Sequence, residues 1–194
     1  MSRLHQLTRP LLIAAGVCFL LALPFELDNT VLNDRPFADV AQSPAHAAAA
    51  WLAMVGFVLL GLAVPGLATR PGSRGGLGTA ATLLGTLGAF AGSTLQWYVA
   101  VVIPWQARSS APELAGELGG VGFYALIAAF TVGTIALGVG CLRSGAVSRT
   151  AGVLVLLGGL CAPLSVAFMA VTGVALIVAG RSLATPRQVE PALV

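Results

Sequence analysis

Charged side chains are the scarcest feature of this 194-residue sequence. Asp, Glu, Lys and Arg together make up 9% of the chain, against roughly 25% in ordinary soluble domains. Ten basic and seven acidic residues are too few to cover the surface of a water-soluble core of this size. This shortage excludes a soluble globular enzyme. The net charge of +3 is small and scattered, which excludes a nucleic-acid-binding surface.

Residues that build metal and redox sites are nearly as scarce. The chain has two His and three Cys, and no Cys-x-x-Cys motif occurs. A zinc or haem site needs several converging ligands of these types. The sequence also lacks a Walker motif, a dinucleotide fingerprint, His-Glu-x-x-His and Gly-x-Ser-x-Gly. We therefore expect neither a metal nor a cofactor.

Long uncharged runs are what the sequence has in abundance. Hydrophobic residues make up 57% of the chain, and the mean hydropathy is +0.93. A membrane-spanning helix needs about 20 apolar residues, and backbone groups in hydrocarbon must bond within the protein, which favours helices. The runs predict an all-α, polytopic transmembrane helical bundle that forms one domain over residues 1–194 in the lipid bilayer. Its five predicted spans cover about residues 8–25, 44–65, 78–104, 120–142 and 150–180.

The last uncharged run, Thr150–Gly180, allows two arrangements. As a single span, it places Arg181 and Arg187 on the side of the membrane opposite the N-terminus. As a hairpin broken at Pro163, it returns them to the side of the N-terminus. Each arm of such a hairpin would measure about 23 Å, which is shorter than the ~30 Å hydrocarbon core. We therefore predict a single span, with four spans plus a broken C-terminal hairpin as the alternative.

The distribution of charge predicts the orientation. Cytoplasmic connections collect Arg and Lys, and six arginines without any acid occupy the segments before span one, between spans two and three, and between spans four and five. These are Arg3, Arg9, Arg70, Arg74, Arg143 and Arg149. The opposite connections hold two arginines and six acids, namely Arg35, Arg108, Glu26, Asp28, Asp34, Asp39, Glu113 and Glu117. We expect a cell (inner) membrane protein with a cytoplasmic N-terminus.

Two carboxyl groups, those of Glu26 and Asp28, follow the first span directly. Ionised carboxylates near hydrocarbon are costly unless they are paired, hydrated or protonated. The simpler interpretation is that these acids solvate an outer loop and set the topology. The functional interpretation places them at the mouth of a cavity, where either could act as a general acid.

Aromatic and amide side chains gather toward the same face of the membrane. Gln96 lies well inside an apolar run, and an amide there needs a partner, water or a ligand. Three aromatic residues end the third span and two open the fourth, so an interfacial aromatic belt is one interpretation. The other is a ligand-binding site formed by Gln96, Trp97, Tyr98, Trp105, Phe123 and Tyr124.

Small residues recur at helical spacing within two spans. Gly88 and Gly92 form a GxxxG element, and Ala136 and Gly140 form a similar one. In lipid such residues let helix backbones approach closely. We interpret them first as packing seams within the chain, and secondly as a homodimer interface.

The layout resembles that of small uncharacterised multi-pass proteins of bacterial inner membranes. The residues that carry the resemblance are the polar loop after the first span, Ser43-Pro44-Ala45-His46 leading into Trp51, and Arg149-Thr150-Ala151-Gly152. This resemblance implies an architecture without an activity. We therefore expect a helical bundle that binds or accompanies an apolar, lipid-like ligand or a membrane-protein partner.

A second resemblance, to small membrane-bound terpene cyclases, concerns size and the presence of acids beside aromatic residues. It implies an enzyme that acts on an isoprenoid or another lipid. A protonated carboxyl, on Glu26 or Asp28, would start the reaction, and aromatic faces would stabilise cations. The sequence leaves open whether the protein is an enzyme.

Overall fold

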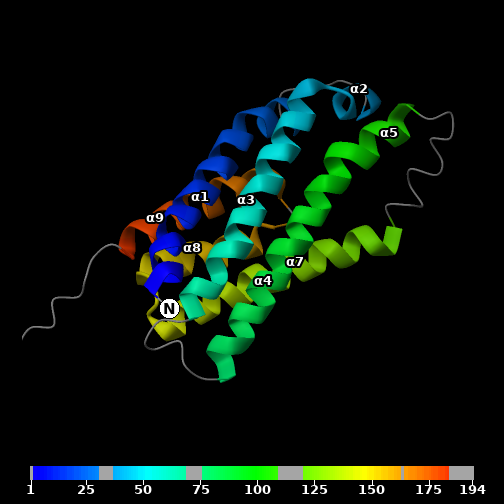
Figure 1. Ribbon diagram of the computed structural model, residues 1–194. Helices are drawn as coiled ribbons and strands as arrows, with labels where there is room; N and C mark the ends of the chain where they lie inside the picture. Colours follow the sequence, from blue (N-terminus) through cyan, green and yellow to red (C-terminus); the bar gives the residue numbers. More distant parts are fainter. Residues whose placement is uncertain (1, 31–36, 69–75, 109–119, 163, 184–194) are drawn as a thin grey trace, which may run out of the picture.

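The computed structural model describes residues 2–30, 37–68, 76–108, 120–162 and 164–183. These ranges are helical and contain no strand, so the predicted all-α fold is confirmed. In Figure 1, α4, the π-helix η1 and α5 run on as one continuous rod. The elements in chain order are α1 (Ser2–Thr30), α2 (Phe37–Ala41), α3 (Pro44–Ala68), α4 (Gly76–Trp97), η1 (Tyr98–Val102), α5 (Ile103–Arg108), α7 (Gly120–Ser144), α8 (Arg149–Leu160) and α9 (Ser165–Ser182).

Five stretches of helix in the described ranges are long and apolar enough to cross a membrane. Large side chains such as Leu62, Leu83 and Leu87 point outward, whereas alanines such as Ala15 and Ala175 are fully buried between helices. This pattern suits a protein surrounded by lipid, in which close packing rather than burial from water holds helices together. The chain is therefore a multi-pass membrane protein with spans at Gln6–Asp28, Pro44–Ala68, Gly78–Gln106, Gly122–Ser144 and Ser165–Ser182.

The predicted number of five spans is confirmed, but the bounds of the fifth differ from the predicted residues 150–180. This stretch forms two helices, and of these only α9 is long enough to be a candidate span. A turn separates α8 from α9, and in it the Leu164 N–H donates to the Cys161 carbonyl at 2.8 Å; Pro163 itself lies outside the described residues. The two helices form an antiparallel hairpin, since the N–H of Ser148, the residue before α8, donates to the hydroxyl of Ser182, the last residue of α9, at 3.2 Å.

The length argument against a hairpin fails because α8 does not cross the membrane alone. Its 12 residues span about 18 Å, and they pack between two longer helices. A Cβ atom on Gly159 would lie 2.9 Å from the backbone nitrogen of Ile135 in α7. On the other side, a Cβ atom on Gly158 would clash with the side-chain hydroxyl of Thr172 in α9. Contacts on both sides stabilise a helix that is too short to span the hydrocarbon by itself.

Six described helices form a closed ring, in which α1, α3, α4, α7, α8 and α9 each pack against the next and α9 packs against α1. Neighbours run in opposite directions, so the end of α9 lies beside the start of α1 (Figure 1). A Cβ atom on Gly180 would lie 3.1 Å from the Arg9 carbonyl oxygen. We call this the arginine end, defined by Arg9, Arg143, Arg149 and Arg181, and the opposite end the Glu26 end. Of the other topology residues, Asp34, Arg35, Arg70, Arg74, Glu113, Glu117 and Arg187 lie outside the described ranges.

Glycines occupy the positions where neighbouring helices touch. At the crossing of α4 and α7, a Cβ atom on Gly133 would lie 2.6 Å from the Cα of Gly88. One turn along α4, a Cβ atom on Gly92 would lie 2.6 Å from the ring of Phe57 in α3. Both glycines of the GxxxG element therefore serve contacts within the chain.

Four phenylalanine rings fill the middle of the ring of helices. Phe19 of α1, Phe57 of α3, Phe130 of α7 and Phe168 of α9 are all buried. Their ring centroids lie between 4.7 and 5.7 Å apart in the five pairs that touch. Four of these pairs are edge-to-face, an arrangement that adds about 0.5–1.5 kcal/mol per pair beyond burial. This phenylalanine cluster joins helices that are not neighbours in the ring.

A methyl group at the α4–α7 crossing tests the ring packing. We expect Gly133→Ala to lower the free energy of unfolding by about 1–3 kcal/mol, because the backbones must separate. Gly122→Ala on the same helix is the matched control, since a Cβ atom there would meet nothing within 4 Å and Ala is the better helix former. Thermal unfolding in detergent measures both, and equal stability of the two variants would contradict the packing.

Candidate functional site

A cavity of about 280 Å³ lies inside the ring toward the Glu26 end. Its wall is mostly apolar, with three polar side chains, and the phenylalanine cluster supplies its floor. Ligand sites in proteins share this character, a largely apolar pocket of about 300–1,000 Å³ with few polar groups. The lining residues are Glu26, Ala50, Phe57, Leu95, Gln96, Val99, Phe123, Ile127, Phe130, Ala162, Ser165, Phe168 and Met169.

Two interruptions of helix geometry border the cavity. In η1 the Ile103 N–H donates to the Tyr98 carbonyl. Pro104 follows directly, and in a regular α-helix its ring would clash with the Ala100 carbonyl, to which it also has no N–H to donate. The second interruption is the turn between α8 and α9. Irregular backbone at membrane depth is tolerated where protein buries it or where it lines a cavity. Val99 of η1 and Ala162 of the turn both line this one.

Glu26 is the best-shielded charged residue of the described part. The other charged side chains that the structure describes are exposed, whereas Glu26 is half-buried near the end of α1. The Ser165 hydroxyl donates a hydrogen bond of 2.7 Å to Glu26 Oε1. Ser165 is the first residue of α9, and the positive end of a helix dipole favours a nearby carboxylate. The carboxyl thus joins α1 to α9 and presents an acceptor at the cavity wall.

Gln96 contributes a second polar group from the opposite side of the ring. It lies near the end of α4 and lines the cavity. Its amide makes no hydrogen bond with another residue of the described ranges. An amide carries two N–H donors and a carbonyl acceptor, and in an apolar cavity these groups favour water or a ligand as the partner.

Besides its polar side chains, the cavity wall presents the faces of four aromatic rings. Phe57, Phe130 and Phe168 line the cavity and touch one another. Phe123 lines it nearer to the ends of the helices, where its ring lies 5.8 Å from that of Tyr98. Such faces attract hydrocarbon and, through their quadrupole, cations.

The cavity unites only some of the residues predicted for the site. Glu26, Gln96 and Phe123 line the cavity. Tyr98 does not line it, but its ring packs against that of Phe123. Trp97, Trp105 and Tyr124 point outward, with 47%, 62% and 71% of their surface exposed, as an interfacial belt would require. Asp28 is exposed and does not line the cavity. The ligand-binding and general-acid roles stay predictions.

Sequence reasoning missed Ser165 and the three phenylalanines of the floor. A phenylalanine inside an apolar run looks the same whether it faces lipid, core or cavity, so no local signal separates these cases. Ser165 carried only a weak signal, namely a hydroxyl two residues after Pro163, where a helix can begin. Because residues 150–180 were predicted as one continuous helix, no helix start was expected at Ser165.

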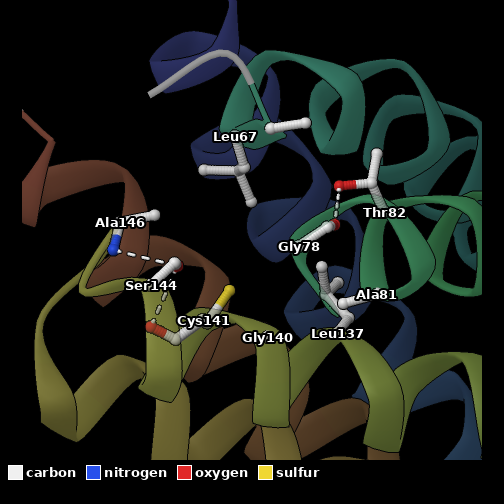
Figure 2. A pocket seen from close by; sticks show the side chains of 10 residues that line it. Leu67, Gly78, Ala81, Thr82, Leu137, Gly140, Cys141, Ser144 and Ala146 are labelled. Carbon is white, nitrogen blue, oxygen red and sulfur yellow. Dashed lines mark hydrogen bonds between the residues drawn. The ribbon is translucent and has the colours of Figure 1, made fainter. Parts of the chain in front are cut away.

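A second, much smaller cavity lies near the arginine end between α3, α4 and α7 (Figure 2). Its volume of about 20 Å³ has room for about one water molecule. The Thr82 and Ser144 hydroxyls donate to carbonyls of their own helix at 2.8 and 3.5 Å (Figure 2). Because its polar groups are satisfied locally and its volume is small, this cavity is not a ligand site.

Comparison of the chain with protein-family models, with curated proteins and with solved structures finds no match.

The hydrogen bond between Ser165 and Glu26 should be measurable as stability. We expect Ser165→Ala to lower the free energy of unfolding by about 1.5–3 kcal/mol, the range for hydrogen bonds to charged groups. A double-mutant cycle with Glu26→Gln should give a coupling energy of about 1 kcal/mol. Ser93→Ala, at another half-buried serine, should change stability by less than about 0.5 kcal/mol. Additive effects in the cycle would contradict a direct bond.

Proposed function

We propose that this protein binds a small apolar, lipid-like ligand in the cavity at the Glu26 end. The observation that carries the proposal is an apolar, phenylalanine-floored space of about 280 Å³ inside a multi-pass membrane protein. At about 30 Å³ for each water-sized group, it has room for roughly nine or ten non-hydrogen atoms. That size suits a short isoprenoid or the end of an alkyl chain.

The short helix α8 supports entry of the ligand from the bilayer. α8 ends at Leu160, so toward the Glu26 end none of the described helices lies between α7 and α9. Both of these helices contribute to the cavity wall, for example through Ile127 and Met169. Leu160 and Leu164 at this gap are more than half exposed and would face lipid. A hydrocarbon chain in the membrane could thus reach the cavity without crossing water.

The orientation that we propose places the arginine end in the cytoplasm of a bacterial cell, at its inner membrane. The ring of six helices supports it, because Arg181 joins Arg9, Arg143 and Arg149 at one end, in agreement with the excess of Arg and Lys in cytoplasmic connections. The cavity then lies toward the outer face. A membrane-protein partner or a second copy of the chain remains the alternative to a small ligand.

A photoreactive hydrocarbon tests the proposed cavity. We expect a ten-carbon alkane bearing a diazirine to label Ile127 and Met169, identified by peptide mass spectrometry. Ala50→Leu adds three carbons to the wall and should reduce this labelling about tenfold. Ala125→Leu, on the exposed face of α7, should leave it unchanged. Labelling confined to outward residues such as Leu62 and Leu83 would contradict a cavity that binds hydrocarbon.

A second candidate function is cyclisation of an isoprenoid, favoured by the presence of a carboxyl and four aromatic rings on the cavity wall. Protonated Glu26 would donate a proton to a double bond. The resulting carbocation would be stabilised by the rings of Phe57, Phe130 and Phe168. A second double bond of the same substrate would attack it, and its π electrons would form the C–C bond that closes the ring. The new carbocation would lose a proton to the Glu26 carboxylate, which completes an isomerisation and regenerates the acid.

This candidate predicts different outcomes for the two acids. With an acyclic ten-carbon isoprenoid as substrate, the protein should form a cyclic product of equal mass, detected by gas chromatography. Glu26→Gln should abolish the product, because an amide cannot supply the proton. Asp28→Asn, at the exposed acid, should retain it. If the wild-type protein and Glu26→Gln yield equal amounts of product, including none, Glu26 is not the acid.

A further inference from the structure

The sequence spacing of the helices gives the cavity a defined depth. On three helices, a residue of the cavity wall near the Glu26 end lies seven residues from a ring of the phenylalanine cluster. The pairs are Glu26 and Phe19 of α1, Ala50 and Phe57 of α3, and Phe123 and Phe130 of α7. Seven residues are close to two helical turns, so both residues of a pair lie on one face of their helix. Since three helices give the same spacing, these two levels lie about 10.5 Å apart.

This depth corresponds to a short hydrocarbon chain. An extended chain of single bonds advances about 1.2 Å per bond, as the backbone does with three bonds in about 3.6 Å. A depth of about 10.5 Å therefore accommodates roughly eight or nine bonds, the length of a nine- or ten-carbon chain. The volume of about 280 Å³ independently has room for roughly nine or ten non-hydrogen atoms. Depth and volume agree only if the cavity is about as wide as one chain.

The phenylalanine cluster closes the deep end of the cavity. The rings of Phe57, Phe130 and Phe168 line its floor, and each touches the other two at centroid distances of 4.7 to 5.7 Å. Rings at this separation are in van der Waals contact, so a methylene chain cannot pass between them. Farther toward the arginine end, Leu60 and Leu176 are buried and belong to the same core. A chain that enters the cavity therefore ends at these rings.

The polar side chains of the wall fix the other end of a bound amphiphile. Glu26 and Ser165 lie at the Glu26 end, joined by a hydrogen bond of 2.7 Å, and Gln96 lies near the same end of α4. Carboxyl, hydroxyl and amide groups can hydrogen-bond a polar group of a ligand, whereas the phenylalanine floor offers it only an apolar surface. A polar group buried without a hydrogen bond is costly. The ligand thus binds with its polar end at the Glu26 end and its chain toward the floor.

We infer that the phenylalanine cluster limits the ligand to a single chain of about ten carbons, with Phe130 as the residue that determines this length. The inference rests on the proposed function, because it names the class of ligand that the same cavity takes. Phe130 is seven residues deeper than Phe123 on α7, beside the gap through which the ligand enters, and Ile127 lines the cavity between them. Lipid tails in each half of the bilayer extend about 15 Å, half of the ~30 Å hydrocarbon core. The cavity thus selects medium-chain molecules over the longer lipids that surround the protein.

A series of alcohols tests the length limit on the wild-type protein, so no variant has to fold. The protein is held in lipid nanodiscs, a ten-carbon alcohol bearing a diazirine is the probe, and labelling of Ile127 and Met169 is the readout. The competitors are the straight-chain 1-alkanols with six to sixteen carbons, compared at equal mole fraction in the bilayer because longer chains partition into it more strongly. We expect decan-1-ol to compete best and tetradecan-1-ol to compete at least about tenfold less well, because its extra methylenes have no room.

Two identical substitutions at different phenylalanines identify the residue that determines the length. Phe130→Leu removes three carbons from the floor, and the space that it leaves should move the best competitor from ten to about twelve carbons. Phe90→Leu makes the same change to a ring of α4 that is 52% exposed, and it should leave the optimum at ten. If folded Phe130→Leu keeps the wild-type optimum, the assignment of the limit to Phe130 is overturned.

The remaining outcomes separate this inference from the proposed function. If tetradecan-1-ol and hexadecan-1-ol compete as well as decan-1-ol while Ala50→Leu removes the labelling, the cavity binds hydrocarbon chains but the phenylalanine cluster does not limit their length. The inference is then wrong and the proposed function stands. If no alcohol displaces the probe and Ala50→Leu has no effect, the proposed ligand cavity itself is wrong.

Discussion

The contacts among Phe19, Phe57, Phe130 and Phe168 hold the structure together at its centre. A ring of helices without a central helix leaves an interior that must be filled, since interiors of proteins are packed as densely as organic crystals. Alanine and glycine let neighbouring helices touch at the rim, but they are too small to reach the middle. Four large rings, one from each of four helices, fill it through contacts of 4.7–5.7 Å. Three of the four also form the floor of the cavity, so the core and the candidate site share the same residues.

The cavity exists where regular helix packing ends. Toward the arginine end all six helices of the ring are present, and the cavity between α3, α4 and α7 measures only about 20 Å³. Toward the Glu26 end α8 has stopped, η1 widens the rod that continues α4, and α9 is only beginning. These interruptions leave an open space and also supply its polar groups, because the start of α9 provides Ser165 and the positive end of a dipole beside Glu26. A carboxyl can be held there at lower cost than elsewhere in the spans.

Sequence alone was sufficient for the fold class, because hydrocarbon permits few alternatives to helices and charges mark the boundaries of the spans. It was not sufficient for the last span. The 12 residues of α8 are too few to cross the membrane, and only the neighbouring helices that cover α8 allow it to end inside the bundle. For the candidate site, Glu26 and Gln96 could be selected because polar groups in apolar runs need a partner. The phenylalanines of the cavity floor could not be selected, because the direction in which each side chain points depends on how its helix is rotated about its own axis in the ring. Trp97, Trp105 and Tyr124 were grouped with the site because sequence shows their depth in the membrane but not their direction.

The account depends on the last apolar run turning back to close the ring, and topology reporters test this most directly. A reporter active only in the cytoplasm and one active only outside it would be fused, separately, before Met1 and after Val194. A closed ring of six helices, with the α8–α9 hairpin returning the chain to the arginine end, predicts that both ends of the chain report the same side of the membrane. If the two ends report opposite sides, residues 150–180 cross the membrane once. The packing of α9 against α1, the bond between Ser165 and Glu26, and the cavity beside them would then not exist as described.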